Sequence, residues 1–215
     1  MIAYALKILQ AELENHIDIY VQDHLLDKVV LANLSEGLEG SGDGLVKREK
    51  IVLSIVNIKE EKTLKNIPTY VRNDVTLKAT YENPPVFLNF LLLVTSTHVD
   101  YDSAITYLSR VVRFFQHKNV FTQDNVDPSI LDNVKIVKQP VSPLDKPETF
   151  KLIFDLYSPT LEEVNHLWGT LGGKQYPFVL YMMRMLDLKY KAVQSESGLI
   201  TEVVTEFSHK KAVSN

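Results

Sequence analysis

Residues 86–95 read Val-Phe-Leu-Asn-Phe-Leu-Leu-Leu-Val-Thr, and this run decides the expected fold. Apolar side chains fill both faces of the extended chain, with Asn89 as an isolated interruption. A strand of this kind belongs in a sheet that is covered on both sides. Residues 51–58 have the same character, and residues 29–34 form a shorter apolar run. These runs predict a central sheet with further elements packed on its faces.

Two segments with helical periodicity flank these strands. Residues 2–17 place apolar side chains at steps of three to four, which predicts an amphipathic helix. Residues 101–116 do the same, with Asp100 or Asp102 as the N-terminal cap and His117 near the other end. The stripe expected to be buried in this second helix is Ile105, Leu108, Val111, Val112 and Phe115.

The rest of the chain predicts one more helix and several strands. Thr160-Leu-Glu-Glu163 is a capping box that opens a helix, which the glycines after Trp168 end. Strands are expected at 150–157 and 176–190, with an edge strand at 135–141. One face of the first of these should carry Phe150, Leu152, Phe154 and Leu156. Helices and strands do not alternate regularly, so we predict an α+β fold: a mixed, largely antiparallel sheet packed by about three helices.

Composition limits the classes of function. The 215 residues are 45% hydrophobic and 23% charged, which is typical of a soluble globular protein. The net charge of -4 and the lack of a basic stripe argue against nucleic-acid binding. No apolar run is long enough to span a bilayer, and no signal peptide is recognisable, so a soluble protein kept in a cytoplasm is expected.

Patterns that would support catalysis or ligand binding are weak. With no cysteine, the chain has no disulfide framework, thiolate cluster or cysteine nucleophile. Gly37, Gly40, Gly42 and Gly44 lie in one loop at 35–49, but this loop precedes a strand and lacks the lysine of a phosphate-binding loop. The six histidines show no metal-ligand spacing, and no Gly-x-Ser-x-Gly occurs. We therefore expect no catalytic residues, no cofactor and no metal.

The C-terminal part points to protein assembly. Residues 199–207 favour β-structure and follow a polar stretch, 194–197. Such a strand can add to its own sheet or to the edge of a neighbour's, and the pattern leaves both open. We expect a main domain over 1–190 and a C-terminal arm over 191–215. The candidate interface residues are Leu199, Ile200, Val203, Val204 and Phe207, with Lys135 and Val137 on the expected edge strand.

Four stretches together resemble a known family. They are Ser54–Asn66, Pro84–Val94, Tyr101–Gln116 with Val120–Thr122 behind it, and Leu167-Trp-Gly-Thr-Leu-Gly-Gly-Lys-Gln-Tyr-Pro177 leading into Tyr181–Leu186. In order and spacing they resemble the tail-cap, or tail-terminator, family of phage-tail-like contractile injection systems, which includes the antifeeding-prophage type. The resemblance runs from Met1 to about Tyr190.

This resemblance implies a structural role without catalytic residues. It implies a terminator-like fold and a homohexameric ring on the last layer of inner tube and sheath, which limits length and anchors the sheath end. The implied partners are copies of the chain, the inner tube protein and the sheath protein, with no nucleic acid and no membrane insertion. The implied product is a particle assembled in the bacterial cytoplasm and then released. The alternatives are another tube, sheath or neck component, an enzyme on an unrecognised α+β scaffold, and a nucleotide-binding module at the Gly-rich loop.

Overall fold

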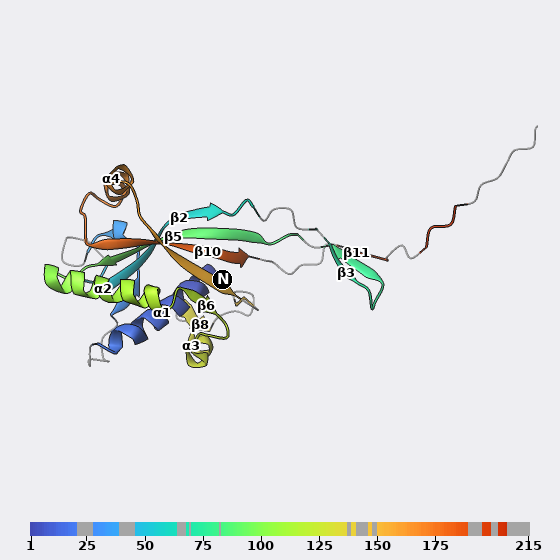
Figure 1. Cartoon of the computed structure of the whole chain (residues 1–215), viewed down its shortest axis with the longest axis horizontal. Helices are drawn as coiled ribbons and strands as arrows, with labels where there is room; N and C mark the ends of the chain where they lie inside the picture. Colours follow the sequence, from blue (N-terminus) through green and yellow to red (C-terminus); the bar gives the residue numbers. More distant parts are fainter. Residues whose placement is uncertain are drawn as a thin grey trace, which may run out of the picture. The chain divides into compact units, whose positions relative to one another are not determined.

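The structure is a computed structural model, shown in Figure 1. It describes residues 1–20, 28–38, 46–63, 68, 70–81, 83–136, 139–140, 146–147, 150–188, 195–198 and 202–205. Two compact units can be distinguished. The first comprises Met1–Leu64 and Val86–Leu188, and the second Lys65–Pro85 and Lys189–Asn215. The functional division expected at residue 190 stays a prediction.

The first unit is built on a six-stranded sheet in the order β1-β2-β5-β10-β9-β6. The strands are β1 (Val29–Leu31), β2 (Ile51–Glu60), β5 (Val86–Ser96), β6 (Val120–Thr122), β9 (Lys151–Tyr157) and β10 (Phe178–Leu188). β1 pairs with β2 in parallel, and every other neighbouring pair is antiparallel. The predicted mixed, largely antiparallel sheet is therefore confirmed.

Helices α1 (Ile2–Asp18) and α2 (Tyr101–His117) pack on one face of this sheet, where the larger hydrophobic core lies. The ring centroid of Phe115 in α2 lies 5.1 Å from that of Phe154 in β9 and 4.1 Å from that of Tyr181 in β10. A short helix, α3 (Pro128–Asn133), contacts α1. Both long helices start and end within two residues of their predicted bounds, because each has a clear apolar period, and Asp100 also caps α2.

Side chains of α1 fix its neighbours. Glu14 accepts the backbone N–H of Val29 at 2.8 Å, which holds the start of β1 against the helix. Glu12 forms an ion pair with Lys118, 2.9 Å apart, just beyond the end of α2. Both partners of this pair are largely shielded from solvent, and α1 therefore links the first edge strand to the end of the second helix.

The buried stripe of α2 differs from the predicted one. Ala104, Leu108, Val111, Phe114 and Phe115 are buried. Ile105 and Val112 are 40% and 37% exposed, so their predicted burial is wrong. The cause is the helix packing beside α2: the Phe114 ring lies 5.2 Å from His16 of α1. Contact with α1 on this flank leaves the opposite flank of α2, which carries Ile105 and Val112, uncovered.

The opposite face of the sheet carries a smaller core around Trp168. It comprises Leu34, Leu38, Val46, Val52, Leu93, Trp168 and Leu180. Trp168 lies on α4 (Leu161–Thr170), which the predicted capping box of Thr160 and Glu163 opens. Gly172 and Gly173 follow with φ angles of 97° and 77°, values that favour glycine and end the helix. With helices on both faces, the first half of β2 and the second half of β5 are buried as their apolar runs predicted, whereas Ile58 and Val86 are 50% and 46% exposed.

The second unit holds a three-stranded antiparallel sheet in the order β11-β4-β3. Its strands are β3 (Tyr70–Asn73), β4 (Lys78–Tyr81) and β11 (Ser195–Gly198). The polar segment between β2 and β5 therefore contains a hairpin. Asn73 Oδ1 shapes its turn by accepting the backbone N–H groups of Val75 and Thr76 at 3.0 and 3.1 Å.

The prediction of one edge strand over 135–141 is wrong. Lys135–Ile136 (β7) and Gln139–Pro140 (β8) pair with each other as a separate two-stranded sheet, with Lys135 opposite Pro140. The chain reverses between them and does not extend along the main sheet. Four helices are present in the described residues, where about three were expected; α3 is the additional one, opened by Asp127.

Candidate protein-interaction surfaces

The C-terminal run that was expected to join partners is described only in part. Val203 and Val204 are 79% and 73% exposed and belong to no strand. Leu199, Ile200 and Phe207 lie outside the described residues, as does Val137. Lys135 lies in β7. The role of these residues in contacts between chains therefore stays a prediction. The two valines are exposed, as the residues of an unpaired segment must be.

The strand that does form near this end is one that the sequence did not indicate. Ser195–Gly198 pairs with β4, with Ser195 opposite Tyr81 and Gly198 opposite Lys78. Its sequence, Ser-Glu-Ser-Gly, has neither β-branched nor apolar residues, so periodicity gives no signal here. Backbone pairing with β4 holds this segment as a strand, although its side chains do not favour β-structure.

The small sheet exposes most of its apolar side chains. Tyr70 is 50% exposed, Val75 94% and Leu77 51%, whereas Ala79 is the one buried apolar side chain described on its strands. Tyr70 and Tyr81 face each other across the pair, with ring centroids 6.2 Å apart. Within the described residues β3 pairs only with β4, so its outer edge is open. A sheet with so little core and an open edge is suited to pairing with another chain.

A second open surface lies in the first unit, beside α2. Ile105, Leu108, Ser109 and Val112 line a shallow hollow of about 260 Å³. On β9, Leu156 is 59% exposed. Leu156 follows the alternation that places Leu152 and Phe154 in the core, so it has the predicted orientation but lies beyond the part of this face that the core covers. We call the surface formed by Ile105, Leu108, Val112 and Leu156 the α2–β9 ledge.

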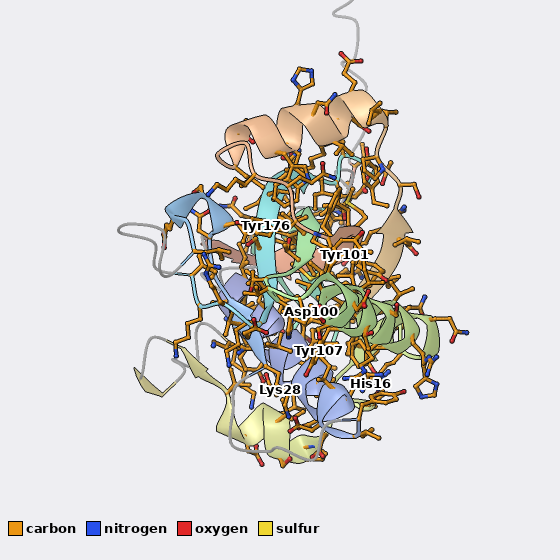
Figure 2. All side chains as sticks on the ribbon, turned by 90° about the vertical axis from the view of Figure 1, so that its left-hand side faces the viewer. His16, Lys28, Asp100, Tyr101, Tyr107 and Tyr176 are labelled. Carbon is orange, nitrogen blue, oxygen red and sulfur yellow. The ribbon has the colours of Figure 1, made fainter. Side chains whose placement is uncertain are left out.

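The other flank of α2 is filled by a stack of rings. The Arg110 guanidinium lies 5.1 Å from the Tyr20 ring centroid and 4.9 Å from that of Tyr107. Tyr107 in turn stacks on His98 at 4.2 Å. Figure 2 shows His16 and Tyr107 at this junction of α1 and α2. Arg110 is therefore packed against two tyrosine rings of its own chain.

Two histidines in this stack have lowered pKa values. Burial lowers the pKa of His16, and the neighbouring His117 and Arg113 lower it further. Burial likewise lowers the pKa of His98, against an opposing effect of Glu49. Both histidines are therefore neutral at pH 7, and they act as packing groups for the aromatic rings around them.

One cavity brings several polar groups together, at the start of α1. It has a volume of about 330 Å³, and Tyr4, Asp132 and Lys146 are among the residues that line it. The Tyr4 hydroxyl is buried without a hydrogen-bond partner. Burial and the Asp132 carboxylate raise the pKa of Tyr4, so this phenol does not release its proton near pH 7.

The described residues contain neither a metal-ligand cluster nor a membrane-spanning helix. No cluster of three or more potential metal ligands occurs among them. None of the described helices has both the length and the apolar character needed to cross a bilayer. In the Gly-rich loop, Val46 donates its N–H to the Gly37 carbonyl at 3.0 Å, whereas Gly40, Gly42 and Gly44 lie outside the described residues.

A fold by itself does not define a function, since one architecture can carry many unrelated activities. The chain belongs to the family described as the Pvc16 N-terminal domain, whose model matches residues 5–202. The predicted family resemblance is confirmed by this match. A comparison with curated proteins gave no match.

Two solved structures share the fold. One is the PVC sheath/tube terminator of an extracellular contractile injection system in its extended state, with a TM-score of 0.53 and 11% identity, over 95% of this chain and 65% of that chain. The other is the anti-feeding prophage cap, a tube terminating cap, with a TM-score of 0.50 and 14% identity, over 90% of this chain and 59% of that one. The tail-terminator-like α+β fold is thus confirmed. The chain spans less than two thirds of either relative's length.

Proposed function

We propose that this protein caps the inner tube and sheath of a contractile injection system. The observation that carries the proposal is the shared fold with a sheath/tube terminator over 95% of this chain. Membership of the Pvc16 N-terminal domain family supports it independently. The protein acts through shape-matched contacts and makes or breaks no bonds in a substrate.

The capping unit in this proposal is a homohexameric ring. A growing tube presents a repeating surface that the next layer recognises, so a terminator must match this surface on one face and offer no copy of it on the other. A ring also distributes the load of sheath contraction over six copies. Each contact between neighbours should bury on the order of 1,000 Å² or more.

The small sheet of the second unit is the surface we assign to the last layer of tube and sheath. Its open β3 edge and exposed Tyr70, Val75 and Leu77 suit an extended segment that adds as a further strand. Backbone hydrogen bonds would give affinity, and the exposed side chains would select the partner. The candidate residues Leu199, Ile200, Val203, Val204, Phe207, Lys135 and Val137 belong to contacts between subunits. Assembly takes place in the bacterial cytoplasm, before the particle is released.

Electron microscopy of particles made without this protein tests the proposal. We expect overlong or frayed tubes, because nothing then stops the addition of layers. Normal tube ends of normal length would overturn the capping role. The assembly state of the purified protein distinguishes a cap from a tube component. A cap forms single rings, whereas a tube protein stacks into cylinders.

A further inference from the structure

The α2–β9 ledge combines an apolar surface with an incomplete sheet edge. Ile105 and Val112 are spaced by two helical turns on one flank of α2, and Leu108 lies between them. On the sheet, Leu156 is the cross-strand partner of Tyr181, whose ring contacts Phe115 of α2. The flank of α2 and Leu156 therefore lie on the same side of the sheet.

Strand β6 ends before it reaches this part of β9. It pairs with Lys151, Leu152 and Ile153, and the last hydrogen bond runs from the Phe154 N–H to the Asn119 carbonyl at 2.8 Å. Alternate residues of an antiparallel strand direct their backbone groups to the same side. The N–H and C=O of Leu156 thus point outward like those of Phe154, and among the described strands only β10 pairs with residues 155–157.

We propose that this edge of β9 and the ledge accept an added β-strand, and that the strand is the 199–207 run of a second copy of this chain. The inference rests on the proposed ring, and it names the contact that joins neighbouring subunits. A strand paired with Leu156 would continue the line of β6. Its inward side chains would then cover Ile105, Val112 and Leu156, which the subunit itself leaves exposed.

The sequence of the run fits this position. One alternating set is Leu199, Thr201, Val203, Thr205 and Phe207, which carries no charge. The other set includes Glu202 and Glu206. The first set suits the apolar ledge, and the second would face the opposite side of the sheet, where Arg184 and Asp155 form a partly exposed ion pair, 3.0 Å apart. Val203 and Val204 are exposed and unpaired in the single chain, as a strand awaiting a partner must be.

The contact is also of the type that builds a ring. The strand and the ledge are different surfaces, so each subunit gives one and receives the other. Such a head-to-tail contact closes into a ring when a whole number of equal rotations between neighbouring subunits makes one full turn. A pairing of identical surfaces would instead stop at a dimer.

Site-specific cross-linking tests the contact, and the natural lack of cysteine makes the background clean. A Leu156→Cys protein is mixed with a Val203→Cys protein and oxidised gently. We expect a disulfide-linked dimer on non-reducing gels. Val204→Cys is the matched control: it belongs to the other face of the strand, so its yield with Leu156→Cys should be several-fold lower. Equal yields, or no dimer with Val203→Cys, would overturn the proposal.

Mixing two variants that cannot assemble alone tests whether the strand on the ledge comes from a neighbouring subunit or from the same chain. Leu156→Glu blocks the ledge and keeps the strand, whereas Val203→Glu blocks the strand and keeps the ledge. Neither should form rings alone, and their mixture should yield one-to-one dimers by light scattering. A Leu156→Cys/Val203→Cys double variant that cross-links only within one chain would overturn the proposal. Cross-link failure in a protein that still forms rings and caps tubes would leave the proposed function standing.

Discussion

The two sheets of this chain are held together in different ways. In the six-stranded sheet, Phe90 and Leu93 of β5 point to opposite faces, and both are fully buried under helices. In the three-stranded sheet, Ala79 is the one apolar side chain described on the strands that is buried. Burial of apolar surface is the main favourable term in folding, so the first sheet has a large stabilising core, whereas the second relies mainly on backbone pairing.

Truncation of a buried aromatic side chain in the six-stranded sheet should have the largest effect on the free energy of unfolding. Phe90 in β5 is 0% exposed, so Phe90→Ala leaves a cavity within the larger core. We expect a loss of about 3–5 kcal/mol in the free energy of unfolding. Tyr81→Ala in the small sheet is the control, since that ring is 38% exposed and should lose much less. Urea denaturation measures both, and equal losses would mean that the two sheets do not differ as described.

Protonation of the ring stack should have the next largest effect. The pKa values of His16 and His98 are lowered in the folded protein. Below about pH 6.5, the ordinary value for histidine, the unfolded chain therefore binds more protons than the folded one. The stability that these neutral histidines provide is present above this pH and is lost as the pH falls through their folded pKa values.

Urea midpoints between pH 7.5 and pH 5 measure this loss, in a window above that in which carboxylates titrate. His16→Gln should flatten the dependence. His166→Gln is the matched control, because its side chain is 79% exposed. The carboxylates act at lower pH: hydrogen bonds from Thr63 and Asn89 lower the pKa of Glu61 to about 2. An unchanged slope with His16→Gln would show that the stack does not exclude protons.

The smallest effect on stability is expected at the tip of the small sheet. Val75 is 94% exposed, so Val75→Ser should change the free energy of unfolding by no more than about 0.5 kcal/mol. If this sheet contacts the last layer of a tube or sheath, the same change should weaken the binding of purified protein to preformed tubes in a pelleting assay. Thr76→Ser is the conservative control. Unchanged binding with Val75→Ser would remove the hairpin tip from the proposed contact.

Sequence patterns predicted the first unit better than the second, for a physical reason. The double-sided run at 86–95 and the capping box at Thr160 are local signals, and the structure confirms both. β3, β4 and β11 have weak patterns because few of their side chains are buried, and period-two alternation arises from burial on one face. The hairpin at β7 and β8 was missed since a short apolar run does not reveal where the chain reverses.

The candidate surfaces, too, could be predicted only in part from the sequence. The sequence alone identifies Val203 and Val204 as apolar residues in a β-favouring run, and the structure adds that both are exposed. The ledge needs the structure, because Ile105 and Val112 carry the same apolar signal as the residues that the core buries. The packing of α1 against Phe114 decides which of them remain exposed.

The sequence by itself determined the α+β class, both long helices, the central strands and the family, because each depends on local periodicity or on the order of motifs along the chain. Only the tertiary structure decided which flank of α2 is free, where β6 ends beside β9, and that a polar segment at 195–198 completes a sheet with β4. These features arise from contacts between residues far apart in the chain, and the free energy of such contacts is not encoded in any single segment.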